Sequence, residues 1–129
     1  MNELLGMHHV ALICSNYEAS KKFYTSVLGL KVLSEIYRAD RQSYKLDLEL
    51  PGGVQIELFS FPESPKRLSY PEACGLRHLA LKVSDIERVI NRLEQQGIEV
   101  EPVRTDESTG KKFSFFSDPD GLPIELYEA

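Results

Sequence analysis

Two pairs of short apolar stretches in the sequence each carry one residue that could bind a metal or move a proton. His9 begins HVALIC and His78 begins HLALKV, while Glu57 lies in VQIEL and Glu125 in PIEL. Imidazole nitrogens and carboxylate oxygens are common ligands of divalent metals, and a carboxylate can also act as a general base. A carboxylate in the middle of an apolar strand needs a partner, because desolvating an unpaired charge is costly. These four residues are therefore candidate ligands.

The chain repeats itself at two nearly equal offsets. At an offset of 69, residues 9–18 align with residues 78–87 and agree at five of ten positions. At an offset of 68, residues 51–58 align with residues 119–126 and agree at five of eight. A one-residue change of offset is what a single loop deletion leaves in a duplicated unit, so the pattern indicates duplication.

The repeat sorts the candidate residues into equivalent positions. It pairs His9 with His78 and Glu57 with Glu125, whereas His8 pairs with Arg77. We therefore expect His8 to lie outside the metal site.

The elements that must position these residues follow from hydrophobic period and turn residues. They indicate an α+β fold of two βαβββ modules, about residues 7–61 and 76–128, joined by a connection at 62–75 that is rich in Pro, Ser and charge. The expected strands are 9–14, 30–37, 43–50 and 54–61 in the first module and 78–83, 98–104, 112–117 and 122–128 in the second.

A helix is expected after the first strand of each module. Ser15 and Ser84 are each followed three residues later by a glutamate, which is the pattern of a capping box. Gly29 and Gly97 supply the expected helix stops. In the second helix, an apolar stripe at helical spacing should face the core: it consists of Ile86, Val89, Ile90 and Leu93.

Strand alternation places both glutamates on the face of the sheet away from the helix. Ile56 and Leu58 would face the helix and Glu57 the other side, and Ile124 and Leu126 likewise oppose Glu125. If a pseudo-twofold axis relates the modules, the two histidines and two glutamates meet near it as one metal site. The alternative is that these residues are hydrogen-bonded core or edge residues.

Composition excludes several classes of partner. The 129 residues are 42% hydrophobic and carry a net charge of −5, with scattered Lys and Arg. Such a chain offers no basic field to nucleic acid or anionic lipid, and it contains no stretch long enough to span a membrane. We expect a single cytoplasmic domain, residues 1–129, with a small-molecule partner. The two cysteines, Cys14 and Cys74, suggest no disulfide framework.

The HxAL of each first strand, the IEL of each last strand and the DPDGLPIEL of residues 118–126 resemble the vicinal oxygen chelate (VOC) superfamily. Its members include glyoxalase I, extradiol dioxygenases, methylmalonyl-CoA epimerase, and fosfomycin and bleomycin resistance proteins. The resemblance spans about residues 7–128 and implies the glyoxalase-like fold. It also implies metal ligands from the first and last strand of each module, which correspond here to His9, Glu57, His78 and Glu125.

Two histidines with two glutamates look most like the glyoxalase I branch. That resemblance implies one divalent ion (Ni, Co, Mn, Fe or Zn) that holds vicinal oxygens of a small substrate and stabilises an enediolate. A glutamate would move the proton, with Glu125 the first candidate and Glu57 the second. The expected activity is that of a metal-dependent lyase or isomerase. The alternatives are an iron extradiol-type dioxygenase and a drug-binding resistance protein without catalysis.

The resemblance is incomplete where the substrate would bind. Relatives that use glutathione conjugates carry an arginine four residues after the first histidine ligand and an asparagine four residues after the first glutamate, where this chain has Ile13 and Phe61. We therefore expect a different substrate. Candidates to line its pocket are Arg38, Lys45, Asp47, Arg104 and Phe113. The resemblance also predicts a homodimer, and it leaves open whether a site forms within one chain or across two.

Overall fold

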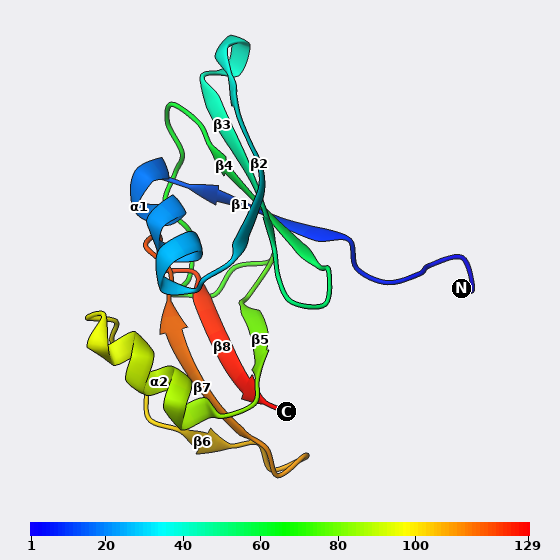
Figure 1. Cartoon of the computed structure of the whole chain (residues 1–129), viewed down its shortest axis with the longest axis vertical. Coiled ribbons are helices and arrows are strands. Elements are labelled where there is room, and N and C mark those ends of the chain that lie inside the picture. The colour runs from blue at the N-terminus through cyan, green and yellow to red at the C-terminus, as the bar shows by residue number, and fades with distance from the viewer. The chain divides into compact units, whose positions relative to one another are not determined.

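The computed structural model describes residues 1–129 and divides them into two compact units, Met1–Lys66 and Arg67–Ala129, here called module 1 and module 2. The division falls within the connection expected at residues 62–75. Each module contains one four-stranded sheet with a helix after its first strand (Figure 1). The predicted α+β class with two βαβββ modules is confirmed.

Module 1 runs β1 (His9–Cys14), α1 (Tyr17–Lys22), a π-helical turn η1 (Phe23–Val27), β2 (Lys31–Arg38), a 3-10 turn η2 (Ala39–Arg41), β3 (Ser43–Glu49) and β4 (Gln55–Ser60). The strand order is β1-β4-β3-β2. β1 pairs parallel with β4, and the other two pairings are antiparallel. β1 and β2 are thus the edges of this sheet.

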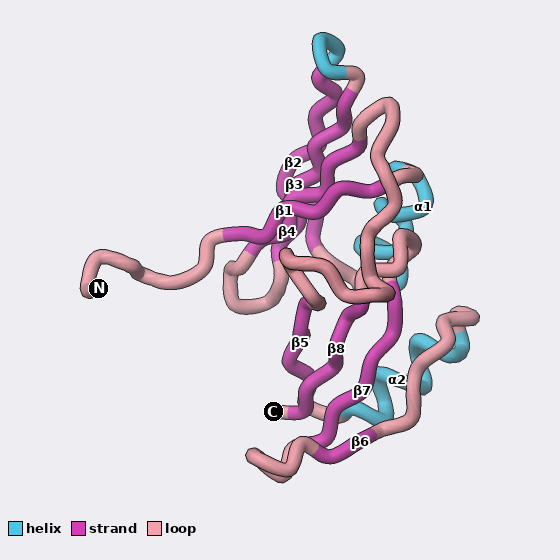
Figure 2. The backbone as a smooth tube through the Cα atoms, turned by 180° about the vertical axis from the view of Figure 1, so that it is seen from behind, coloured by secondary structure: helices cyan, strands magenta, loops and turns pink.

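Module 2 runs β5 (Leu79–Val83), α2 (Ile86–Gln95), β6 (Arg104–Thr105), β7 (Lys112–Ser117) and β8 (Pro123–Glu128). The order β5-β8-β7-β6 repeats that of module 1, with β5 parallel to β8. Figure 2 shows α2 running beside the sheet of this module. None of the helices of the chain is long and apolar enough to cross a membrane.

Each helix begins with a short amide or carboxylate side chain. Asn16 Oδ1 accepts a hydrogen bond of 3.1 Å from the backbone N–H of residue 19, and Asp85 Oδ1 accepts one of 3.1 Å from that of residue 88. The prediction that Ser15 and Ser84 cap the helices was therefore wrong by one residue. Asn and Asp reach the third helical N–H as well as serine does, and here they take that position.

The expected helix stops are confirmed at both glycines, whose φ angles of 74° at Gly29 and 80° at Gly97 favour a residue without a Cβ. After α2, the N–H of Gly97 donates to Glu94 O and that of Ile98 to Leu93 O, both at 3.0 Å. This pair of bonds is a Schellman motif.

One expected strand is almost absent. Residues 98–104 were predicted as a strand, but only Arg104–Thr105 pair with β7. Pro102 has no N–H to donate, so a regular ladder cannot pass through it. The segment still follows β7 through Glu101, whose N–H donates to Phe115 O at 2.9 Å. The other strands agree with the prediction to within one residue at each end.

The two faces of each sheet differ as the alternation predicts. On β4, Ile56 and Leu58 are buried while Glu57 is half-buried. On β8, Ile124 and Leu126 are buried while Glu125 is half-buried. The helix side of each sheet therefore holds the core, and the opposite side, here called the open face, carries the glutamates.

Candidate functional site

In module 1 the expected histidine and glutamate lie together on the open face. His9 Nε2 is 3.5 Å from Glu57 Oε1, and the glutamate side chain is only 16% exposed. The register of β1 with β4 sets His9 opposite Gln55 and Ala11 opposite Glu57. Because alanine is small, the carboxylate can lean along the strand toward the imidazole.

Module 2 repeats the arrangement. His78 lies just before β5, and its Nε2 is 3.4 Å from Oε1 of Glu125, whose side chain is 15% exposed. Ala80 stands opposite Glu125, as Ala11 stands opposite its equivalent. The HxA of the repeat thus supplies the histidine of each pair and, two residues later, the space for its glutamate partner.

The geometry of each pair is compatible with a shared metal ion. Two ligand atoms that each lie about 2.0–2.2 Å from one ion are about 3–3.6 Å apart at ordinary coordination angles. The separations of 3.5 Å and 3.4 Å fall in that range. Nitrogen from a neutral imidazole and oxygen from a carboxylate are also a donor set that transition metals accept. The residues therefore fit a divalent ion.

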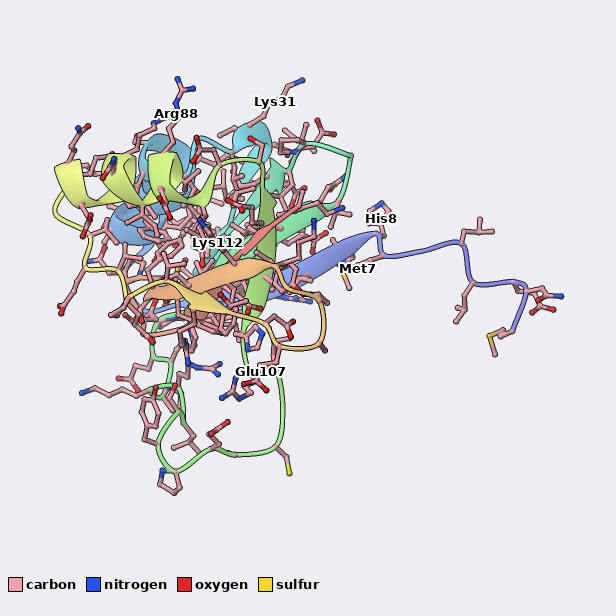
Figure 3. All side chains as sticks on the ribbon, turned by 90° about the horizontal axis from the view of Figure 1, so that it is seen from below. Met7, His8, Lys31, Arg88, Glu107 and Lys112 are labelled. Atoms are coloured by element: carbon pink, nitrogen blue, oxygen red, sulfur yellow. The ribbon has the colours of Figure 1, made fainter.

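The two histidines differ in what meets their second ring nitrogen. His8 Nδ1 lies 2.8 Å from Nδ1 of His9, while Arg77 Nη1 lies 3.3 Å from Nδ1 of His78. Figure 3 shows His8 where the N-terminal segment joins β1. Sequence reasoning placed His8 outside the site and gave Arg77 no role. The repeat already paired these two residues, and their position next to a ligand histidine was the available clue.

Charged side chains surround Glu57. Asp47 lies opposite it on β3, and Lys45 Nζ contacts Asp47 at 2.7 and 2.9 Å and Glu57 Oε2 at 4.0 Å. Arg38, the third pocket candidate of this module, donates to Ser43 Oγ at 2.9 Å, and its guanidinium lies 5.0 Å from the centre of the Phe59 ring. The structure therefore brings Lys45 and Asp47 to the glutamate and directs Arg38 to an aromatic ring.

Aromatic rings surround Glu125. Phe115 lies opposite it on β7 and meets the His78 ring edge-on, with centroids 5.1 Å apart. Phe113 packs against Phe115 in the same manner at 6.2 Å. The Arg104 guanidinium lies over both phenyl rings, at 4.9 Å from Phe113 and 5.7 Å from Phe115. Arg104 and Phe113, the pocket candidates of module 2, thus belong to one cluster beside the ligand pair.

Each module by itself brings two metal-ligating side chains together and no group of three. The meeting of the two pairs at one ion stays a prediction. So do the catalytic roles expected for Glu125 and Glu57.

Comparison with known proteins gives the family. Residues 6–126 match the Glyoxalase/Bleomycin resistance protein/Dioxygenase superfamily. The uncharacterized protein YwkD of Bacillus subtilis is 57% identical over 125 residues, covering 97% of this chain and 98% of that protein. The lactoylglutathione lyase of Salmonella typhimurium is 30% identical over 128 residues, covering 94% and 90%.

Among solved structures, a glyoxalase family protein from Enterococcus faecalis is 55% identical with a TM-score of 0.89, covering 96% of this chain and 98% of that one. The match to the family extends from before the first candidate ligand to after the last. The chain therefore belongs to the Glyoxalase/Bleomycin resistance protein/Dioxygenase superfamily.

Proposed function

We propose that this protein is a metal-dependent lyase or isomerase of the glyoxalase type that acts on a small molecule with vicinal oxygens. The observation that carries the proposal is the duplicated pair of histidine and glutamate, at 3.5 Å in module 1 and 3.4 Å in module 2. One such pair alone could be a structural hydrogen-bonded pair. Because the same two ligand types recur on the same face of both sheets, a shared ion is favoured. The superfamily relationship supports this assignment.

In this proposal His9, Glu57, His78 and Glu125 hold one divalent ion from the group Ni, Co, Mn, Fe and Zn. When bound, the ion supplies Lewis-acid polarisation of the substrate oxygens. The protein supplies the proton transfer. We assign that role to Glu125, because its cross-strand neighbour is Phe115. Glu57 has charged neighbours instead, with Lys45 Nζ 4.0 Å away, and stays the second candidate.

Metal content and proton exchange together test the proposal. Purified protein is stripped with a chelator, reconstituted with each of the five ions in turn, and measured by elemental analysis. A panel of small hydroxy-ketones, oxo-aldehydes and hydroxy-acids is then incubated in D2O with each metal form, and exchange of the C–H next to the carbonyl is followed by NMR. We expect about one ion for each pair of modules and exchange that depends on it. Failure of every ion to bind after reconstitution contradicts the proposal.

We further propose that the protein is a homodimer. β1 and β2 are edge strands of module 1, and large apolar side chains are exposed on both, including Ile13, Val32 and Ile36. Open edges with apolar side chains favour association with a second chain. Light scattering at micromolar concentration should give twice the 14.7 kDa chain mass, and a monomer mass across that range contradicts the proposal.

A further inference from the structure

Module 2 contains a cavity of about 350 Å³ between the loop of residues 67–77 and the open face of its sheet. The sheet side of the cavity is formed by Phe115 and Pro123, and the loop side includes Arg67, Arg77 and Cys74. Figure 3 shows this loop on the side of the sheet opposite α2. The cavity adjoins the ligand pair because Phe115, which lines it, also contacts the His78 ring.

The loop that forms the cavity is held in place by one arginine. Arg67 Nη2 donates to the carbonyl oxygens of Leu76 and Arg77, both at 2.9 Å, and its Nε donates to Ser69 Oγ at 2.8 Å. These partners are neutral, so they leave the positive charge of Arg67 uncompensated. The same bonds join the two ends of the loop, which gives the cavity a fixed wall.

The cavity is positive although the chain is acidic. Three arginines line it against two glutamates, while the whole chain has a net charge of −5. Arg77 is engaged by Glu72 at 2.7 Å, and that hydrogen bond raises the pKa of the guanidinium. Arg104 approaches Glu101 only at 3.5 Å. Arg104 is therefore the arginine with the most donor capacity left for a ligand.

The position of Arg104 suits recognition of an anion. Its guanidinium carbon lies over the rings of Phe113 and Phe115, which are nearly perpendicular to each other, so two rings restrict the movement of the group. The N–H groups of a guanidinium point outward in its own plane and match the two oxygens of a carboxylate or phosphate. A guanidinium restricted by two rings loses less further freedom when it binds a ligand, which favours affinity.

We infer that this cavity binds the anionic end of the substrate, a carboxylate or a phosphate, with Arg104 as the main anchor and Arg67 and Arg77 adding positive field. The inference rests on the proposed function, because the reacting end of the substrate would then lie toward His78 and Glu125. It narrows the substrate class to small acids or phosphate esters with vicinal oxygens.

Binding to metal-free protein tests the cavity separately from the metal. The chelator-treated full chain, labelled with 15N, is titrated by NMR with glycolate, with 2-hydroxyethyl phosphate and with the neutral glycolamide. We expect amide shifts in the loop of residues 67–77 and in β6 and β7 with the two anions and none with glycolamide. Tighter binding of glycolate identifies a carboxylate site, and tighter binding of 2-hydroxyethyl phosphate identifies a phosphate site.

Substitutions locate the binding. Arg104→Gln should weaken anion binding by about tenfold or more, as expected for loss of a charge-assisted pair of hydrogen bonds. Arg104→Lys keeps the charge but not the planar guanidinium, so its anion affinity should lie between those of the parent chain and Arg104→Gln. Arg88→Gln removes the same charge from an exposed position on α2, on the far side from the loop (Figure 3), and should leave the affinity within about twofold.

Cys74 offers an independent reporter, since it is exposed and lines the cavity while Cys14 is buried. A bound anion should slow alkylation of Cys74 by neutral iodoacetamide, measured by mass spectrometry. The inference is overturned if neither anion binds the metal-free chain, or if Arg104→Gln binds as tightly as the parent. If anions bind there but no metal is ever taken up, the proposed function fails while the cavity assignment stands.

Discussion

The two modules carry the same histidine–glutamate pair in different surroundings. Glu57 and Glu125 occupy equivalent strand positions, and each lies about 3.5 Å from a histidine. The internal repeat, at its offset of 68 residues, aligns Lys45 and Asp47 of module 1 with Phe113 and Phe115 of module 2. One glutamate therefore faces charged neighbours and the other faces aromatic rings.

The comparison distinguishes the residues that both modules keep from those that differ between them. The feature common to both modules is the histidine–glutamate pair with a small alanine opposite the glutamate, which suits a ligand set contributed half by each module. The neighbours differ between the modules, which is what the proposed function leads us to expect for a substrate with unlike ends. The charged wall of Lys45 and Asp47 can bind polar groups, and the aromatic wall of Phe113 and Phe115 can hold the guanidinium of Arg104 by cation–π contact.

The largest effect should follow from removing either imidazole. His9→Ala and His78→Ala should each weaken metal binding by more than the roughly 100-fold that loss of a mere supporting partner costs. The circular dichroism spectrum should not change, because both rings are partly exposed. Isothermal titration with Ni²⁺ or Zn²⁺ measures the loss. If one variant binds metal like the parent, the two pairs do not share an ion.

A smaller effect on metal affinity should follow from changing the residue beside Nδ1 of each histidine. A histidine that binds a metal through Nε2 carries its proton on Nδ1 and donates it to a neighbour. His8 can accept that proton from His9 at 2.8 Å, whereas Arg77 only donates and approaches His78 Nδ1 as a cation. His8→Ala should therefore weaken metal binding by roughly 10- to 100-fold.

The corresponding change in module 2, Arg77→Gln, should leave metal affinity unchanged or raise it, because a positive neighbour is removed. The same titration serves for both variants. Equal losses in His8→Ala and Arg77→Gln contradict the distinction between the modules.

The free energy of unfolding should depend more on the aromatic wall than on the charged wall. Phe115 is half-buried between His78, Phe113 and Arg104, so Phe115→Ala should lower the free energy of unfolding by about 1–2 kcal/mol, less than the roughly 3–5 kcal/mol of a fully buried phenylalanine. Asp47→Asn breaks a partly exposed ion pair with Lys45 and should cost about 0.5 kcal/mol. Urea unfolding monitored by circular dichroism gives both values. A larger loss for Asp47→Asn reverses the comparison.

Much of this arrangement could be predicted from sequence, because period and duplication act together. Two-residue alternation fixes the face of Glu57 and Glu125, and the repeat indicates that both matter. The failures have local causes. Serine and Asn or Asp stand side by side before each helix, and all of these residues can cap. Residues 98–104 alternate like a strand, but Pro102 breaks the ladder.

The site was harder to predict than the fold. Neighbours in sequence such as His8 and His9 normally point to opposite sides of a strand, so alternation gave no reason to expect contact between their rings. The contact is possible because β1 begins at His9 and His8 precedes it. The position of the Arg104 guanidinium over two phenylalanines likewise depends on side-chain direction, which hydrophobic period does not encode.

The smallest effect should be the turnover of a glutathione hemithioacetal. A glutathione hemithioacetal carries two carboxylates that need charged donors, which arginine usually supplies. Where glutathione-using relatives are expected to place arginine and asparagine, this chain has Ile13, which is 60% exposed, and Phe61, which stacks with Phe59. Two basic residues that could replace them are already engaged, since Arg38 donates to Ser43 and Lys112 contacts Glu87 at 3.3 Å.

Metal-reconstituted protein should therefore turn over methylglyoxal with glutathione poorly, with kcat/KM below the ~10⁴ M⁻¹s⁻¹ at the lower end of ordinary enzymes. Spectrophotometric detection of the thioester product measures this rate. Ile13→Arg should change it little, because one added cation satisfies only one of the two carboxylates and leaves the other against Phe61. A rate at or above that limit with the unmodified chain contradicts the prediction, and would mean that the aromatic wall with Arg104 serves the carboxylates of glutathione.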